Sequence, residues 1–124
     1  MLGLFGLFGR SRELRALDHA LREAGVHPQA VPEAVKLTTA RLLKERAGDP
    51  DAARHDAAQL LGYCMLGREP FVDANDVRAA DEVENRLEAA ATEGEGFDAR
   101  LILLALHSGV IVPEVADRFD VETR

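Results

Sequence analysis

Apolar residues recur every three or four positions along most of this chain, and most of these runs stop at a glycine or a proline. The first run has this spacing at Leu14, Leu17, Leu21 and Ala24, and Gly25 follows it. Side chains three and four positions apart share one face of an α-helix, whereas a half-buried strand would alternate. The spacing therefore predicts amphipathic helices joined by short connections.

The residue usage supports helices over strands. The 124 residues include 20 Ala and 17 Leu, but only 2 Ile, 1 Tyr and no Trp. Ala and Leu favour helices, whereas Ile, Tyr and Trp favour strands. The run Val110–Val112 resembles a strand, but it is three residues long and lies between a glycine and a proline, which indicates a connection.

Six helices are predicted, and two of them are apolar nearly all round. The predicted helices span residues 11–24, 32–46, 51–66, 75–92, 98–108 and 113–119. The third and fifth should lie at the centre because they have no broad polar face. Residues 67–71 are predicted as a loop, with a possible extra turn over 70–74. Gly62 inside the third helix indicates a close approach of another backbone or a tolerated weak point.

The expected fold is all-α, a compact single-domain bundle of five main helices plus a short C-terminal helix. The length corresponds to about one domain, and no linker divides the chain. We expect one helical domain over residues 10–124, preceded by an apolar segment over residues 1–9.

The apolar segment is the most unusual feature of the sequence. It repeats a Gly-Leu-Phe unit, and its three glycines disfavour an isolated helix. Its large side chains need cover from the bundle itself, a neighbouring subunit or a membrane, unless the segment is disordered. With the arginines that follow, it forms the predicted interaction site. The candidate residues are Leu2, Leu4, Phe5, Leu7, Phe8, Arg10 and Arg12.

Charge argues against nucleic-acid binding, because phosphate neutralisation needs clustered positive charge and the net charge is −7. Residues 1–46 hold eight basic and five acidic groups, and residues 47–124 hold seven basic and seventeen acidic groups. Several of these acids lie in or near the predicted helix over 75–92, as a solvated face or an acidic docking surface. They are Asp73, Asp76, Asp81, Glu82, Glu84 and Glu88.

The single cysteine, Cys64, forbids an intramolecular disulfide and suggests a reducing cytoplasmic setting. The bias toward Ala, Arg and Gly is typical of a GC-rich bacterial genome. No apolar run reaches the roughly 18–20 residues needed to span a bilayer. The first nine residues also lack the preceding positive charge of a signal peptide.

No catalytic or metal-ligating set can be assembled from the spacing. Of the four histidines, no two are three or four positions apart, and the pair Asp51–His55 lacks further ligands. Cys64 is predicted to be an inert buried thiol, and the Tyr63 hydroxyl is expected to reach the surface. His107 is expected to cap a helix C-terminus. We therefore predict no metal and no cofactor.

These observations favour a small non-enzymatic interaction or accessory protein that binds a protein partner or a second copy of itself. The first alternative is a peripheral membrane-surface protein anchored through residues 1–12. The second is a small-ligand-binding domain with a pocket between helices, near Cys64 or His107.

Overall fold

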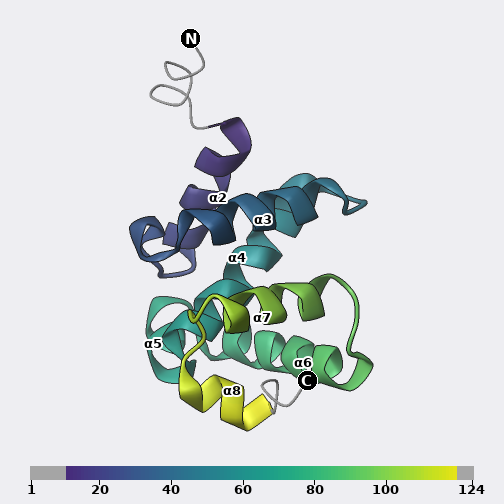
Figure 1. Cartoon of the computed structure of the whole chain (residues 1–124). Coiled ribbons are helices and arrows are strands. Elements are labelled where there is room, and N and C mark those ends of the chain that lie inside the picture. The colour runs from purple at the N-terminus through teal and green to yellow at the C-terminus, as the bar shows by residue number, and fades with distance from the viewer. Residues whose placement is uncertain (1–10, 120–124) are drawn as a thin grey trace.

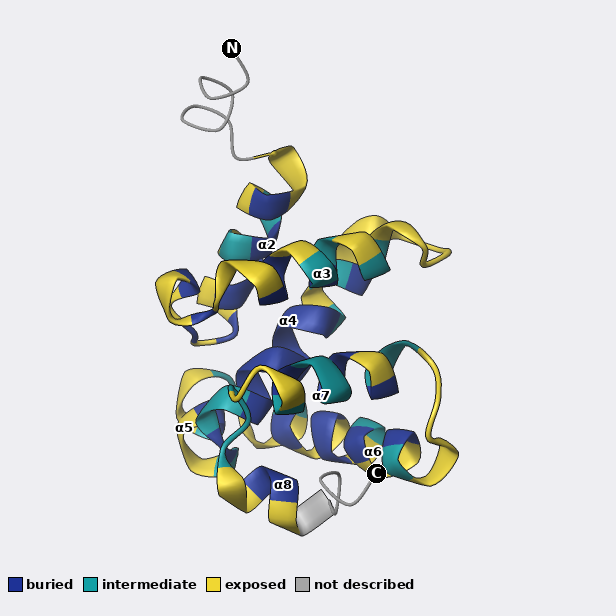
Figure 2. Cartoon of the chain, in the orientation of Figure 1, coloured by how far each residue is buried: buried dark blue, intermediate teal, exposed yellow. Residues whose placement is uncertain are grey.

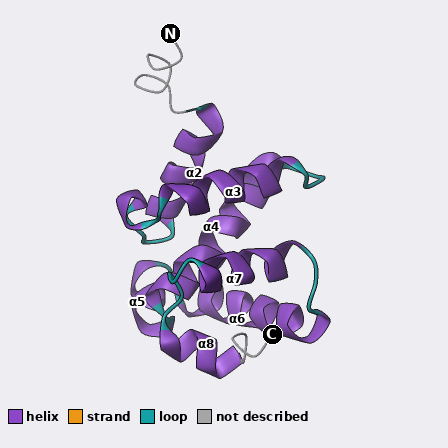
Figure 3. Cartoon of the chain, in the orientation of Figure 1, coloured by secondary structure: helices purple, strands orange, loops and turns teal. Residues whose placement is uncertain are grey.

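The computed structural model describes residues 11–119, and all regular structure in that range is helical. Seven α-helices and one short 3-10 helix follow one another without a strand (Figure 3). This confirms the all-α prediction for the described range. In chain order the elements are α2 (Arg12–Glu23), η1 (Pro28–Ala30), α3 (Glu33–Lys44), α4 (Pro50–Leu66), α5 (Arg68–Ala74), α6 (Val77–Glu93), α7 (Phe97–His107) and α8 (Pro113–Phe119).

The long helix α4 passes through the middle of the fold. It contacts α2, α3, α5, α6 and α7. Helices α2 and α3 lie at one end of the molecule, and α5 to α8 gather at the other (Figure 1). Every residue from Ala57 to Cys64 is buried, so this part of α4 has no solvent-facing side (Figure 2). The prediction that this helix is central is confirmed.

One hydrophobic core connects the two ends of the molecule. It draws side chains from all seven helices, α2 to α8, with Val26 and Val31 from the connection around η1. Burial of this apolar surface is the main force holding short helices together, since isolated helices of this length are marginal in water. The largest fully buried side chains include Tyr63, Phe71, Leu17, Leu21, Leu60, Leu61, Leu87 and Leu101.

Small residues let the end of α2 approach α4 and α5 closely. A Cβ atom at Gly62 would lie 3.3 Å from the Cβ of Ala24. A Cβ atom at Gly25 would lie only 2.4 Å from the Cβ of Ala74, and Gly25 has a φ of +100°. The first of the two readings of Gly62, a close approach of another segment, is therefore correct.

The expected number of helices is wrong, because residues 68–74 form the separate helix α5. Gly67, with a φ of +84°, breaks the chain direction after α4. Pro70 is the third residue of α5, where its missing N–H costs no helical hydrogen bond. Phe71 is fully buried and packs edge-on against Tyr63, with 5.5 Å between the ring centroids. This packing stabilises a seven-residue helix, which includes the possible extra turn predicted over 70–74.

Two expectations about buried faces also need correction. The fifth predicted helix, now α7, is not central over its whole circumference, because Leu103, Leu104 and Leu106 are only half-buried. On α6, the helical spacing of Val77, Ala80 and Val83 predicts an inward position for Val77, but Val77 is exposed. Both helices pack one face against the core, and these other apolar residues are half-buried or exposed.

Helix starts follow the cap residues in the sequence. The Ser11 side chain accepts a hydrogen bond from the Leu14 N–H at 3.1 Å. Asp49 and Asp76 cap α4 and α6 in the same way. These side chains satisfy backbone N–H groups that have no partner inside the helix.

Candidate interaction surface

A groove runs along the outer side of α2 and α3, near the first described residues. It consists of two cavities, of about 220 and 260 Å³, that share Glu13, Ala40 and Lys44. We call this surface the α2–α3 groove. Its lining residues are Ser11, Glu13, Leu14, Leu37, Ala40, Arg41, Leu43, Lys44, Arg46, Pro50 and Arg54.

The groove has an apolar floor that is open to solvent. Leu37 is 48% exposed and lies on the same face of α3 as Ala40 and Arg41. Leu14 contributes from α2, although its own side chain is largely buried. Leu37 is not among the candidate residues that were predicted from the sequence.

The walls of the groove are mostly basic. Arg41, Lys44, Arg46 and Arg54 line it, against the single acidic residue Glu13. The Glu13 carboxylate is bonded by its own backbone N–H and attracted by Lys44, and both effects lower its pKa. Glu13 therefore stays ionised near neutral pH. It is the only acidic residue in the lining, although Asp51 pairs with Arg54 from outside it.

Most residues of the predicted interaction site lie outside the described range. Arg12 is described; it is the first residue of α2 and is exposed beside the groove. Ser11, which lines the groove, is the position at which the preceding apolar segment joins the described fold. The residues outside the described range are Leu2, Leu4, Phe5, Leu7, Phe8 and Arg10.

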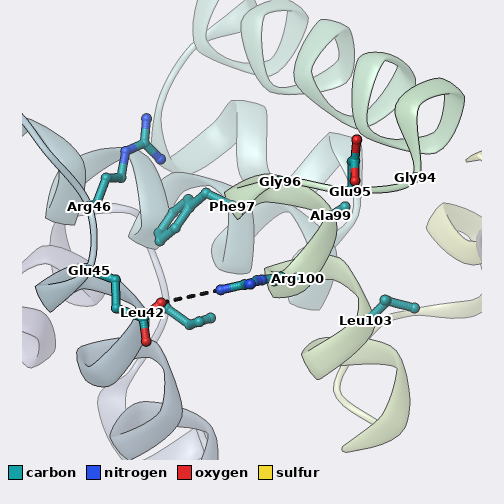
Figure 4. A pocket seen from close by; sticks show the side chains of 10 residues that line it. All are labelled: Leu42, Glu45, Arg46, Gly94, Glu95, Gly96, Phe97, Ala99, Arg100 and Leu103. Carbon is teal, nitrogen blue, oxygen red and sulfur yellow. Dashed lines mark hydrogen bonds and ion pairs between the residues drawn. The ribbon is translucent and has the colours of Figure 1, made fainter.

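A further cavity, of about 390 Å³, lies between the end of α3 and the start of α7 (Figure 4). The Arg46 guanidinium lies 4.4 Å from the centre of the Phe97 ring, and Arg100 forms a 3.3 Å ion pair with Glu45. Figure 4 shows Arg100 pointing toward Glu45 across the opening. The two arginines thus already have partners within the protein, and the cavity shows no nucleophile beside a base.

The buried polar groups form a structural network at the other end of the molecule. Tyr63 donates a hydrogen bond to the Glu84 carboxylate, and Arg68 pairs with the same carboxylate at 2.8 Å. The hydrogen bonds that Arg68 donates to Glu84 and then to Asp81 raise the pKa of Arg68. Two expectations were therefore wrong, since Glu84 does not face solvent and the Tyr63 hydroxyl does not reach the surface.

The other acidic residues of that region do face solvent. Asp73, Asp76, Asp81, Glu82 and Glu88 are exposed. Because these side chains are exposed, they form a solvated face around α6.

The side chains considered from the sequence as possible metal ligands or catalytic groups do not form one site in the described residues. The Asp51 carboxylate pairs with Arg54 at 2.7 Å, and His55 is exposed. His107 is exposed at the end of α7, and Cys64 is fully buried. Neither of the last two lines the cavities described above. Across residues 11–119, no three His, Cys, Asp or Glu side chains gather in a way that could hold a metal ion.

The helices in the described range include none that is both long and apolar enough to cross a membrane. No family model, curated protein or solved structure gives a significant match to this chain.

Proposed function

We propose that this is a non-enzymatic interaction protein that binds a protein partner, or a second copy of itself, through the α2–α3 groove and the apolar segment before it. The segment supplies apolar side chains, and Arg10 and Arg12 supply positive charge beside them. The segment's apolar residues are Leu2, Leu4, Phe5, Leu7 and Phe8.

The exposure of Leu37 supports this proposal most directly. It is one of two large apolar side chains, with Val77, that are prominently exposed in the described range. Leu37 differs from Val77 in lying in a groove with further apolar residues and a basic rim. Apolar patches rimmed by polar groups are typical of protein interaction sites.

Basic charge around the groove favours one alternative, a peripheral protein of an anionic membrane surface. Apolar residues flanked by arginines bind such surfaces by shallow insertion and electrostatic attraction. Arg12, Arg41 and Lys44 lie on the same end of the molecule as the start of the described chain. We favour the protein partner because the groove is concave and apolar at its floor.

A cytoplasmic location is part of the same proposal. Cys64 is the only cysteine, and it is buried and reduced in the fold. This is the usual state of thiols in a reducing compartment.

The test compares three proteins by size exclusion with light scattering over a range of concentrations: the intact chain, a chain lacking residues 2–9, and Leu37→Ser. Val77→Ser is the matched control, because Val77 is equally exposed on another helix. We expect the intact chain and Val77→Ser to self-associate, and the other two proteins to remain monomers.

The same four proteins are then mixed with vesicles of anionic and of neutral lipid. If the intact chain stays monomeric but binds anionic vesicles through residues 2–9, the membrane alternative replaces the proposal. If the intact chain does neither, self-association through this surface is wrong. If the intact chain associates but deletion and Leu37→Ser change nothing, the assignment of the groove and the segment is wrong.

A further inference from the structure

A small hollow of about 220 Å³ lies where α6 ends and α7 begins, and we call it the α6–α7 hollow. Its apolar lining comes from Ala89, Ala90 and Phe97, of which Ala89 is exposed and Phe97 is half-buried. Glu93 and Glu95 line it as well, and both are exposed. The other lining residues are Arg46, Arg86, Gly96 and Asp98. The hollow therefore combines a small apolar surface with acidic side chains.

The charge of the α6–α7 hollow is negative. Its lining holds three acids and two arginines. Arg86 is paired with Asp98 at 2.9 Å, and the Arg46 guanidinium lies over an aromatic ring. Within the described part of the chain, Glu93 and Glu95 take part in no ion pair. These two carboxylates are therefore available to cations from outside the protein.

The α2–α3 groove has the opposite charge beside a protruding apolar side chain. Leu37 is 48% exposed, and Arg41 and Lys44 follow it on α3 at spacings of four and three residues. These spacings place the three side chains on one face of the helix. Among the described residues, Arg41 and Lys44 form no ion pair. This face of α3 thus offers an apolar knob and two available cations.

We propose that the α3 face of Leu37, Arg41 and Lys44 binds the α6–α7 hollow of a second copy of the chain. Leu37 covers the apolar part of the hollow, and the two cations face Glu93 and Glu95 at its edge. The inference rests on the proposed function, and it names the partner and the surface that the partner presents.

Charge favours this unlike contact over a contact between two like surfaces. Two α2–α3 grooves set against each other bring Arg41 and Lys44 close to the same residues of the other copy. Like charges across an interface cost free energy, whereas opposite charges steer the encounter and fix its register. Burial of the exposed Leu37 side chain then adds apolar stabilisation to the charge pairing.

Val77 lies outside the proposed contact and remains a valid control. It is the first residue of α6, and Glu93 is the last. Sixteen residues of helical rise place the two about 24 Å apart along the helix axis. Val77→Ser therefore leaves both contacting surfaces unchanged.

An exchange of charges tests the contact by size exclusion with light scattering over a range of concentrations. The groove variant carries Arg41→Glu with Lys44→Glu, the hollow variant carries Glu93→Lys with Glu95→Lys, and the exchanged variant carries all four. Each double variant sets like charges against each other, so we expect its self-association to weaken at least about tenfold. The exchanged variant, and a mixture of the two double variants, should regain association to within about threefold of the intact chain.

The matched control is Glu69→Lys with Asp73→Lys. Both residues are exposed on α5, and the net charge changes by the same amount as in the hollow variant. This control should associate like the intact chain. Circular dichroism establishes that each variant is folded, so that a loss of association is not a loss of structure.

The outcomes separate this inference from the proposed function. If Leu37→Ser and the groove variant abolish association but the hollow variant does not, the groove binds a second copy elsewhere, and only this inference is overturned. A folded exchanged variant that stays monomeric overturns it as well. An intact chain that is monomeric at every concentration excludes a second copy as the partner, and only a different protein partner is then left for the proposed function.

Discussion

Tyr63 on α4 donates a hydrogen bond to the Glu84 carboxylate on α6, and both residues are buried. Arg68, the first residue of α5, pairs with the same carboxylate. Three helices therefore meet at one buried acid, which was expected on a solvated face. A buried carboxylate is tolerated there because it accepts a hydrogen bond from the Tyr63 hydroxyl and pairs with the Arg68 guanidinium.

Removing this acid should destabilise the fold. Glu84→Ala leaves the Tyr63 hydroxyl without its acceptor, so we expect a loss of about 1–3 kcal/mol in the free energy of unfolding. Tyr63→Phe should cost less, about 1 kcal/mol, because Arg68 still pairs with the carboxylate. Urea unfolding followed by circular dichroism measures both. Glu88→Ala, on the exposed side of α6, should stay within about 0.5 kcal/mol of the native protein. Equal effects of the two alanine variants would contradict the network.

Gly25 and Gly48 have nearly the same φ, so alanine variants of the two distinguish steric crowding from backbone strain. Gly25 and Gly48 have φ angles of +100° and +99°, but only Gly25 faces a neighbour, Ala74. Gly48→Ala should cost about 1–2 kcal/mol for the unfavourable φ alone. Gly25→Ala should cost at least about 1 kcal/mol more, because the new Cβ overpacks the contact with Ala74. Thermal and urea unfolding compare the two variants, and similar losses would show that the end of α2 can move away from α5.

A forked ion pair ties α6 to α7. The Arg86 Nε and Nη2 atoms donate to the two oxygens of Asp98 at 3.0 and 2.9 Å, and Nη1 donates to the Asp56 carbonyl. Both side chains are 25% exposed, so solvent screens them only in part. A double-mutant cycle with Arg86→Ala and Asp98→Ala should give a coupling on the order of 1 kcal/mol.

The control for that cycle is the pair Arg78–Glu82. These side chains lie 3.7 Å apart and are 89% and 67% exposed. Their coupling should be below about 0.5 kcal/mol, since exposed pairs gain little and lose side-chain freedom. Equal couplings in the two cycles would show that the fork adds nothing to a simple surface pair.

The buried thiol of Cys64 should make the stability of the fold depend on pH in the alkaline range. Burial raises the pKa of Cys64 to about 12, above its ordinary value of about 9. Between these values the unfolded chain loses the thiol proton and the folded chain keeps it, so stability falls as the pH rises through this window. Below about pH 9 both states are protonated and the effect is absent.

The measurement compares the native protein with Cys64→Ala, by urea unfolding at about pH 8 and about pH 10. The stability advantage of the native protein over Cys64→Ala should shrink at the higher pH. In the folded native protein, Cys64 should also resist iodoacetamide near neutral pH and react once urea is added. Rapid alkylation in the folded state, or a constant difference between the two proteins, would contradict the burial of this thiol.

Local sequence predicted the helices well where a stop signal and an apolar stripe coincide. The predicted helix over residues 11–24 is α2, with Ser11 as its cap. The apolar run after Ala57 gave the central helix correctly. These features depend on residues that are close in sequence, which is why periodicity and caps suffice to find them.

Contacts between distant residues could not be read from the spacing. Asn75 joins three segments, because its side-chain amide donates to the Ala24 carbonyl at 2.9 Å and accepts from Gln59. Lys36 is buried because its ammonium finds the Pro28 carbonyl and the Asp18 carboxylate. A polar residue gives no sequence signal that its partner lies many positions away.

The sequence by itself determined that the chain is helical, where most helices begin and end, and that an apolar segment with arginines precedes them. The tertiary structure alone decided that α5 forms, that Glu84 is buried, and that Leu37 lies in an open groove beside Ser11. The physical reason is that helical propensity and capping act within a few residues. Burial and the pairing of charges depend on which helix faces overlap, and that overlap exists only after packing.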